Sequence, residues 1–594
     1  MVSEFLVTNK EELKAKGWDA LDIILITGDA YVDHQSFAAS LLGRWLEKHG
    51  FKVGIIAQPS WTNTADFSEL GAPRLFFGVT AGNLDSLVAN NTSEKKTRRE
   101  DMYSPGGIVG KRPDRAVTVY CNILKQLYKD SMIVIGGIEA SLRRITHYDY
   151  WSNKVRRPIL FDCRADVLVY GMGELALLEL AKRVSENKDW HDVGNVSYIS
   201  KEVPEEDVLT IDSFEDVSSK EESFVSSHIN YHKEFVSGGN RKVVQECQKR
   251  YVIINPPREF TTHDLDDIAE LKFLRKQHPS YKEKVPAFGF VRDSVVTHRG
   301  CYGGCYFCVL GIHQGKKIIS RSEESLVKEV KNIISKDSEF KGTIQDVGGP
   351  TANMYESVCS KEQPCSRFSC LMPSPCKYLR PNQQSHLKLI KEISKVEGVN
   401  NVFVNSGIRF DLALLDKQYS KSILANHVSG QLSMAPEHIC DNVLKLMNKP
   451  NNSVYEEFEE LFEQENKRNN KKQFIIPYFI AAYPGSSLND MYKLSKYLRE
   501  RNMRIKQVQN FIPIPMSVAS VMYYTGKDPF SGSELYVAKG DDRLLQRALL
   551  QPWLKSNFSF VKRALNKIGK ENDYSYLTGD KQLKNNSGPS WKKR

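Results

Sequence analysis

The sequence of 594 residues lacks any apolar run near the roughly 18 residues that a membrane-spanning helix needs. Its longest candidate, residues 474–483, contains Pro477. The first ten residues lack a basic stretch followed by an apolar one, so we expect no signal peptide. Hydrophobic residues make up 41% and charged residues 26%, which excludes a fibrous or wholly disordered chain. These features predict a cytoplasmic globular protein of several domains, with no membrane partner.

Cysteine is scarce over most of the chain and concentrated in one part of it. Seven of the eleven cysteines lie between positions 301 and 376, and the other four are scattered: Cys121, Cys163, Cys247 and Cys440. Disulfides are rare in cytoplasmic proteins. The concentration therefore indicates metal binding.

Positive charge is concentrated at the end of the chain. The formal net charge is +11, and residues 561–594 contain nine Lys or Arg against three Asp or Glu. Such a segment can contact RNA or a membrane surface, or it can be a solvated chain end. We predict a disordered basic tail over residues 570–594.

The first part of the chain alternates strand and helix patterns. Continuous apolar runs predict buried parallel strands. Residues 1–235 are therefore predicted to form a doubly wound, Rossmann-like α/β domain, which binds ligands at the carboxyl ends of its strands. The acidic, Ser-rich residues after 186 are predicted to be a partly ordered peripheral segment. The predicted strands are 21–28, 52–57, 74–79, 132–136 and 165–170, and the helices are 34–49 and 174–183.

A second strand–helix series follows a bridging segment, residues 236–286. In the bridge, a short helix is predicted over 264–274, with Thr261 or Thr262 near its start. About six βα units then indicate a full or partial (β/α) barrel over 287–569. Its predicted strands are 287–292, 342–348, 401–404, 427–434, 474–482 and 505–512, and its last helix is 542–569.

The strongest motif is a cysteine triplet after the first predicted barrel strand. Cys301, Cys305 and Cys308 follow the pattern C-x3-C-x2-C. Structural zinc sites and ordinary iron–sulfur clusters take four protein ligands, and a local fourth is missing here. Three ligands leave one iron open to a substrate or cofactor. The alternative is a zinc site completed by His298 or His313.

This triplet, with Phe307 inside it and its place after a strand, resembles the radical S-adenosylmethionine (SAM) superfamily. In that superfamily three cysteines hold a [4Fe-4S] cluster whose open iron binds SAM. Reduction then cleaves SAM to a 5'-deoxyadenosyl radical. The resemblance implies such an enzyme, with Phe307 near the adenine and an electron donor such as flavodoxin or ferredoxin.

Two further strand ends are candidates for binding SAM. The second predicted barrel strand ends in Gly348 and Gly349, and the resemblance implies that these glycines contact the methionine amino group. The fourth ends at Glu437, which the resemblance assigns to the ribose or the methionyl group. A helix N-cap or an ion pair is an equal alternative for Glu437.

Longer stretches look like the YgiQ family of radical SAM proteins, and the likeness covers about residues 29–569. It implies an N-terminal domain similar to cobalamin-binding folds, but it implies no particular substrate. The cobalamin-ligand pattern D-x-H-x-x-G is missing, because His34 follows Asp33 directly and position 37 is Phe37. Cobalamin binding is therefore doubtful. The stretches that carry the likeness are 136–144, 147–151, 170–174, 346–355 and 511–516.

A second cysteine group follows the second predicted barrel strand. Four cysteines are enough ligands for zinc or for an auxiliary iron–sulfur cluster, and reduced structural thiols are the third reading. Basic residues between and after them suit an anionic substrate or a solvated surface. The group consists of Cys359, Cys365, Cys370 and Cys376.

Taken together, these motifs predict a radical SAM enzyme whose substrate is unknown. RNA modification is one variant, supported by the basic tail, although no RRM or KH pattern is present. The alternative from another class is a non-enzymatic binding protein in which both cysteine groups hold zinc. A polar–aromatic group in the N-terminal domain either lines a pocket or is structural: Glu139, His147, Asp149 and Trp151.

Overall fold

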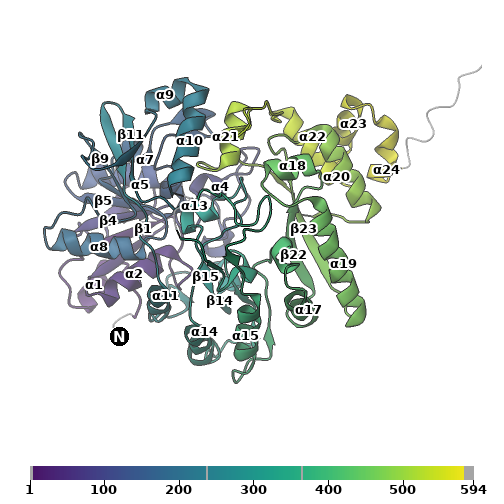
Figure 1. Cartoon of the computed structure of the whole chain (residues 1–594). Helices are drawn as coiled ribbons and strands as arrows, with labels where there is room; N and C mark the ends of the chain where they lie inside the picture. The colour runs from purple at the N-terminus through teal and green to yellow at the C-terminus, as the bar shows by residue number, and fades with distance from the viewer. Residues whose placement is uncertain (1–3, 236–237, 363–364, 507, 581–594) are drawn as a thin grey trace, which may run out of the picture.

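The computed structural model describes residues 4–235, 238–362, 365–506 and 508–580. A nine-stranded sheet flanked by helices forms the N-terminal part, at the left of Figure 1. Shorter strands surrounded by helices form the rest. This is the predicted α/β architecture, a doubly wound domain followed by a barrel-like one.

Five neighbouring strands at one end of the large sheet are parallel, and they are the strands that the apolar runs predict. In sheet order these are β8 (Val167–Val169), β5 (Met132–Gly136), β4 (Phe76–Thr80), β1 (Ile23–Thr27) and β3 (Val53–Ala57). The main helices around them are α2 (Ala38–Lys48), α5 (Ala116–Leu127), α7 (Ile159–Cys163) and α8 (Glu174–Ser185). Shorter elements are α1 (Lys10–Ala15), α3 (Ala65–Ser68), α4 (Ser86–Asn90), α6 (Gly137–Ser141), β6 (His147–Asp149) and β7 (Lys154–Arg156).

Both faces of this sheet are covered by apolar side chains. Ile24 and Ile26 of β1 belong to the core shared with α5 and α7. Ile23 and Leu25 belong to the core shared with α2 and α8. A strand buried on both faces must be apolar at every position, which explains the continuous hydrophobic runs.

Four more strands extend the sheet beyond β8. β9 (Val196–Ser200) is antiparallel to β8, β12 (Arg250–Ile254) to β9, and β11 (Lys242–Cys247) to β12, whereas β10 (Val208–Ile211) is parallel to β11. With α9 (Phe214–Ser219) and α10 (Glu221–Phe235), they show that the acidic segment is folded, because its strands bury alternate apolar residues. The domain boundary predicted at 235 falls inside this sheet.

The bridge between the two parts is shorter than the predicted residues 236–286, because β11 and β12 belong to the sheet. In α11 (Thr262–Ala269), the N-cap residue Thr261 exchanges hydrogen bonds with Asp264, a capping box. The predicted helix start is confirmed, and the helix ends before 274. β13 (Lys276–Gln277) then pairs with β2 (Val32–Asp33), which ties the bridge to the first domain.

The second part is an open, partial barrel of short parallel strands. β14 (Ser294–Val296) pairs with β18 (Asp346–Gly348), and β17 (Thr343–Ile344) pairs with β21 (Asn401–Val402). β22 (Gln431–Glu437), β23 (Phe474–Ala481) and β24 (Gln509–Asn510) form a three-stranded sheet. Helices around these strands are α14 (Glu323–Glu329), α15 (Gln383–Ser394), α16 (Phe410–Ala413), α17 (Lys417–Asn426), α18 (Asp441–Leu446), α19 (Asn452–Arg468) and α20 (Leu488–Glu500).

The strand predicted over 287–292 is wrong. This segment contains α12 (Phe288–Val291), and the first barrel strand begins at Ser294. Phe288 and Val291 stand three positions apart and both pack against a small core around Phe37. A helical turn places residues three apart on one side, so this contact with the first domain outweighs the strand-like apolar composition.

The C-terminal part consists of short helices instead of one long one. It contains α21 (Val518–Thr525), α22 (Asp541–Leu550), α23 (Phe558–Lys567) and α24 (Tyr574–Thr578). α22 ends just before Pro552, which disfavours a helical residue in front of it. Tyr574 and Leu577 of α24 are buried, so residues up to 578 are not a disordered tail. The predicted tail from 581 onward lies outside the described residues.

Buried polar contacts join the two parts of the molecule. Gln35 donates to Glu329 across 2.7 Å, and Arg275 pairs with the same carboxylate at 3.0 Å. Arg299, next to the cysteine loop, pairs with Glu174 of α8 at 2.7 Å. These contacts hold the first domain against the mouth of the barrel.

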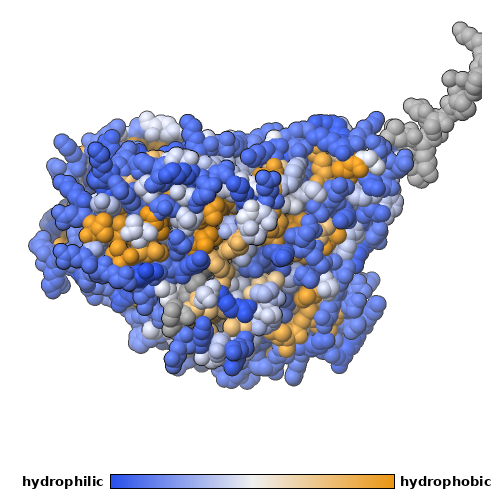
Figure 2. Space-filling model, turned by 45° about the horizontal axis from the view of Figure 1, so that its top comes forward, coloured by the Kyte–Doolittle hydropathy of each residue, from blue (hydrophilic) through white to orange (hydrophobic). Residues whose placement is uncertain are grey.

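The surface shown in Figure 2 is largely hydrophilic and is interrupted by separate apolar patches. Across the described ranges, no helix combines the length and the apolarity needed to cross a bilayer.

Candidate active site

The cysteine triplet lies on a tight loop at the barrel mouth. β15 (His298–Arg299), which pairs with β16 (Ile319–Ser320), precedes the loop, and α13 (Leu310–Gln314) follows it. Gly300 begins the loop with a φ of 91°, and a Cβ there would lie 2.0 Å from the carbonyl oxygen of Lys317. Only glycine fits this position.

Hydrogen bonds from three distant segments hold the loop in place. The backbone N–H of Tyr306 donates to Met447 at 3.1 Å, and its carbonyl accepts from Ala519 of α21 at 2.9 Å. The Ser369 hydroxyl, from the second cysteine segment, donates to the carbonyl of Gly303 at 2.8 Å. The thiols are therefore carried on a fixed scaffold.

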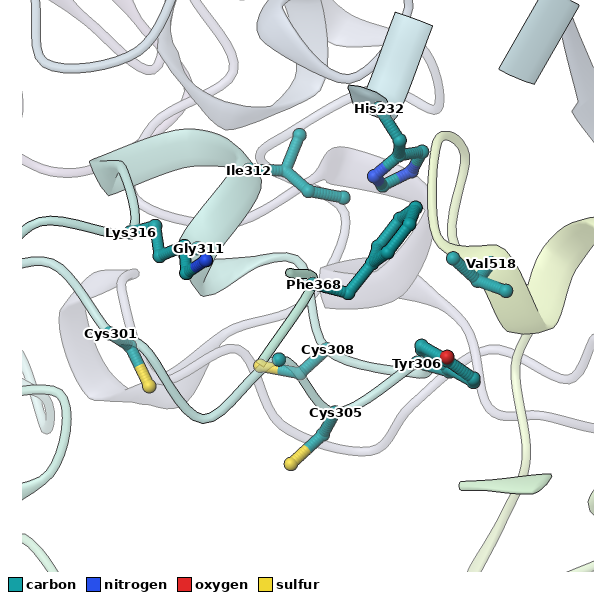
Figure 3. Close-up of a pocket in the computed structure, with 11 residues that line it drawn as sticks. His232, Cys301, Cys305, Tyr306, Cys308, Gly311, Ile312, Lys316, Phe368 and Val518 are labelled. Atoms are coloured by element: carbon teal, nitrogen blue, oxygen red, sulfur yellow. The ribbon is translucent and has the colours of Figure 1, made fainter. Parts of the chain in front are cut away.

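All three cysteines of the triplet contribute to one small pocket, shown in Figure 3. The sulfur atoms of Cys301 and Cys305 point away from Phe368 and His232, which lie on the opposite side of the view. Burial, reinforced by the two neighbouring thiols, raises the pKa of Cys308 to about 12. Burial also raises the pKa of Cys301. The free thiols of Cys301 and Cys308 therefore hold their protons at neutral pH, and a metal displaces those protons when it binds.

A buried arginine reaches the triplet. Arg409 Nη1 lies 3.3 Å from Cys305 Sγ, and the same guanidinium forms a bidentate pair with Asp411 at 2.6 and 3.0 Å. Burial opposes ionisation of Asp411, but Arg409 outweighs it and lowers the pKa of that carboxyl. The retained cation can offset the charge of metal-bound thiolates. Sequence reasoning missed Arg409, whose signal is its place in the loop after the third barrel strand.

Phe307 and Glu437 line one cavity of about 560 Å³. Glu437 has a left-handed φ of 69° beside a register shift in β22, and it is 8% exposed. Burial raises the pKa of Glu437, while Lys449 and Arg409 oppose that shift. The N-cap of α18 is Cys440, and within the described ranges Glu437 forms no ion pair within 4.0 Å. Its carboxyl group therefore remains available to a ligand in the cavity.

Gly348 and Gly349 lie at the end of β18, beside the first barrel strand. A Cβ on Gly348 would lie 1.8 Å from the Ser406 hydroxyl, and one on Gly349 would lie 2.7 Å from the His298 ring. Close packing thus requires both glycines. Neither lines the cysteine pocket or the larger cavity, and their contact with the SAM amino group stays a prediction.

The two histidines considered as zinc ligands are placed elsewhere. His298 shares a hydrogen bond with the Thr297 hydroxyl at 2.8 Å, and neither His298 nor His313 lines the cysteine pocket. In the part of the chain that the structure describes, no three or more His, Cys, Asp or Glu residues are arranged around a single metal ion. An iron–sulfur cluster has a different requirement, because each thiolate binds its own iron atom.

The second cysteine group packs against the first loop. The backbone N–H of Cys370 donates to the carbonyl of Tyr302 at 3.0 Å. Cys365 and Cys370 are buried, Cys376 is half-buried and Cys359 is exposed. This group therefore lies beside the first cysteine loop, whereas its metal content stays a prediction.

The carboxylates of the N-terminal polar–aromatic group bond within their own domain. The carboxylate of Glu139 accepts backbone N–H groups of Ser86 and Val117 at 2.8 and 3.1 Å. Asp149 pairs with Arg115 at 2.5 Å. These bonds match the structural reading. Neither pocket is lined by any member of the group: Glu139, His147, Asp149 and Trp151.

The carboxyl edge of the N-terminal sheet is filled by the chain's own ion pairs. Arg112 reaches Asp29 at 3.0 Å and Asp101 at 3.2 Å, and all three side chains are buried. His34 is also buried and packs edge-on against Phe288, with ring centroids 5.8 Å apart. This is the edge at which such sheets bind ligands. These side chains pair with one another at this edge, and the doubt about cobalamin binding stays a prediction.

Family comparisons agree with the sequence motif. A family model described as "Radical SAM N-terminal" matches residues 5–294, and one described as "Domain of unknown function (DUF3362)" matches residues 506–583. A UPF0313 protein of Methanocella arvoryzae is 46% identical, covering 94% of each chain. A UPF0313 protein of Clostridium botulinum strain 657 is 44% identical, covering 96% of this chain and 91% of its own.

Two solved structures resemble the chain more distantly. The radical SAM methyltransferase TsrM from Kitasatospora setae, with tryptophan and a SAM analogue bound, is 14% identical. That match covers 84% of this chain and 75% of TsrM, with a TM-score of 0.48. The cobalamin-dependent SAM radical enzyme OxsB, with aqua-cobalamin bound, is 12% identical over 96% of this chain and 72% of its own, with a TM-score of 0.47.

The curated relatives match over nearly their whole length, and the N-terminal family model matches the first domain and the bridge. The chain therefore belongs to the UPF0313 family of radical SAM proteins, which confirms the predicted resemblance to the YgiQ family.

Proposed function

We propose that this chain is a radical SAM enzyme in which Cys301, Cys305 and Cys308 hold a [4Fe-4S] cluster with one iron open to SAM. The observation that carries this proposal is a rigid loop with three thiols, whose pocket is lined by no fourth cysteine among the described residues. When bound, the cluster and SAM supply a 5'-deoxyadenosyl radical that removes a hydrogen atom from a substrate. The protein's own contribution is binding, orientation and charge.

Two cationic side chains offset negative charge at the site. Arg409 stands beside Cys305, as described above. Lys449 donates to the carbonyl of Ala435 at 2.6 Å, and its charge acts on both Glu437 and Asp411. A buried negative cluster is costly without such compensation. We therefore assign Arg409 and Lys449 to charge balance and Glu437 to holding a polar group of SAM or substrate.

The cavity beside Phe307 and Glu437 has the size of a small-molecule site. Residues of the N-terminal domain between 88 and 98 form one wall, and the segment 508–514 forms another. Glu94, from the first wall, accepts from Asn510 at 2.5 Å and pairs with Arg547 at 3.1 Å. The N-terminal domain thus helps to enclose the barrel mouth, which excludes water from reactive chemistry. We place the substrate in this cavity.

Anaerobic reconstitution tests the proposed function. We expect the wild type to bind iron and sulfide and to release 5'-deoxyadenosine from SAM when reduced. A Cys301/Cys305/Cys308→Ala variant should lose that release completely. Cys247→Ala, which removes a thiol far along the chain in β11, is the matched control and should retain it. A wild type that takes up zinc alone and leaves SAM intact would establish the non-enzymatic alternative instead.

RNA as the substrate rests on charge alone. Residues 581–594 contain five Lys or Arg and no Asp or Glu. Because α24 is folded into the C-terminal core, the informative deletion starts after Asp580. If RNA is the substrate, this deletion should weaken RNA binding and reduce its salt dependence. Unchanged affinity across a salt series would rule out a role for the tail in RNA binding.

A further inference from the structure

We propose that Cys359, Cys365, Cys370 and Cys376 hold a second iron–sulfur cluster, beside the cysteine loop. This inference goes beyond the proposed SAM chemistry and does not depend on it, because these thiols lie on a different segment. The inference rests on the backbone pairing that brings three of these cysteines together, on the hydrogen bonds that hold their loop, and on their contact with the first triplet.

Backbone pairing gathers three of the four cysteines. β19 (Val358–Cys359) pairs antiparallel with β20 (Leu379–Arg380), and Cys359 stands opposite Leu379. The N–H of Leu379 donates to the carbonyl of Cys376 at 3.0 Å. The N–H of Cys376 in turn donates to the carbonyl of Cys370 at 2.8 Å. One small hairpin and one turn therefore place Cys359, Cys370 and Cys376 together.

The fourth cysteine, Cys365, is buried like Cys370. It stands two residues before Arg367, whose guanidinium holds the turn that carries Cys370. Lys316 supplies a cation on the side facing the first loop, where it also lines the triplet pocket.

The loop that carries these thiols is braced from within. Arg367 donates to the carbonyls of Ser369, Met372 and Ser374 at 3.0, 2.7 and 2.6 Å. Lys316 donates to the carbonyl of Arg367. Arg367, one of the basic residues between these cysteines, therefore uses its guanidinium to hold the turn. The predicted role in binding an anionic substrate is not needed to explain it. A turn fixed by these two partly buried cations presents its thiols in one arrangement.

The two cysteine groups share one apolar core. Tyr302 and Cys370 are both buried in it, and Cys301 and Cys376 pack against it from either side. The hydrogen bonds from Cys370 to Tyr302 and from Ser369 to Gly303 connect the two loops directly. A cluster in the second group would lie next to the first one.

An iron–sulfur cluster suits this arrangement better than zinc. A zinc ion needs four ligand atoms within about 2.3 Å of one point. Throughout the described ranges, the side chains of neither cysteine group converge in that way. A cluster accepts thiolates that are farther apart, since each binds a separate iron. Four cysteines complete such a cluster without the open position that the triplet leaves.

The test uses the full chain after anaerobic reconstitution with iron and sulfide. The wild type should hold about eight iron atoms per chain if both sites take [4Fe-4S] clusters. The Cys301/Cys305/Cys308→Ala variant should keep about four, with equal sulfide and a reduced EPR signal that ignores SAM. Cys359→Ala, which changes an exposed side chain and should fold normally, should also lower the iron content toward four while SAM cleavage remains detectable.

Two results would overturn the proposal. One is a triplet variant that retains zinc without iron or sulfide, and the other is a triplet variant that binds no metal although its circular dichroism and elution volume match the wild type. Cys247→Ala serves again as control and should keep the full iron content. Loss of 5'-deoxyadenosine release in the wild type would refute the proposed function but would leave the iron count of the triplet variant interpretable.

Discussion

The molecule contains two regions where parallel strands end in loops rich in polar residues, and these regions differ in how their charged side chains are paired. At the edge of the N-terminal sheet, Arg112 pairs with Asp29 and Asp101, and Arg143 pairs with Asp85. At the mouth of the barrel, the thiols and Glu437 face a pocket or a cavity. Both places are where α/β folds bind ligands.

The comparison teaches that strand topology alone does not make a site. The polar side chains of the first edge use their charges on one another. At the second, Glu437 forms no ion pair among the described residues, and Arg409 serves both Asp411 and Cys305. Unpartnered polar atoms occur at the first edge too, since His34 Nε2 and Arg143 Nη2 are buried there without hydrogen-bond partners. The binding region is therefore recognised by an unpaired charge that lines a cavity.

The largest expected effect comes from removing the buried cation at the carboxyl edge of the N-terminal sheet. Arg112→Ala leaves Asp29 and Asp101 buried without their cation, which should lower the free energy of unfolding by about 3–5 kcal/mol. Lys388→Ala removes an exposed pair with Glu323 and should cost about 0.5 kcal/mol or less. Urea unfolding measures both. A small effect of Arg112→Ala would show that this edge is hydrated like the barrel mouth.

The cysteine loop can be strained at its first residue. Gly300→Ala places a methyl group 2.0 Å from a backbone oxygen at a φ of 91°, and we expect a loss of about 3 kcal/mol or more together with reduced iron loading. Gly398→Ala is the control, because its φ is 87° and no atom lies within 4 Å. It should cost about 1–2 kcal/mol with iron loading unchanged. Equal effects of the two changes on iron loading would contradict the assigned role of the tight turn.

The pH dependence of stability, compared with that of Asp29→Asn, reports on the carboxyl edge of the N-terminal sheet. Burial raises the pKa of Asp29 to about 6, against the opposing charge of Arg112. Between pH 4 and 6 the folded protein keeps a proton that the unfolded chain has released, so the free energy of unfolding falls as the pH rises. Relative to Asp29→Asn, the wild type should lose about 3 kcal/mol between pH 4 and 7. Parallel stability curves would show that Asp29 titrates normally.

The smallest expected effect is on ligand binding at the barrel mouth, from a change of Glu437. Glu437→Gln removes a charge that faces the cavity, and we expect SAM or substrate to bind about tenfold more weakly, about 1.4 kcal/mol, with iron content unchanged. Glu465→Gln changes a similarly buried carboxylate that lines neither pocket and is the matched control. Equilibrium binding to the reconstituted protein measures this difference. A shift in both variants would indicate a general loss of structure.

Much of the fold was predictable because its determinants are local. Apolar runs marked β1, β3, β4 and β5, and Thr261 marked the start of α11. The predictions failed where distant contacts decided the outcome. α12 forms because Phe288 meets the first domain, and residues 242–254 join a sheet whose other strands lie more than 30 positions earlier.

The sequence by itself determined the thiol spacing, the glycine that starts their loop and the family, because spacing and backbone conformation depend on adjacent residues. Only the tertiary structure decided that Arg409 touches Cys305, that Cys370 lies on Tyr302, and that residues 88–98 enclose the cavity. Those contacts join segments far apart in the chain. They follow from the packing of whole domain faces, which no local pattern encodes.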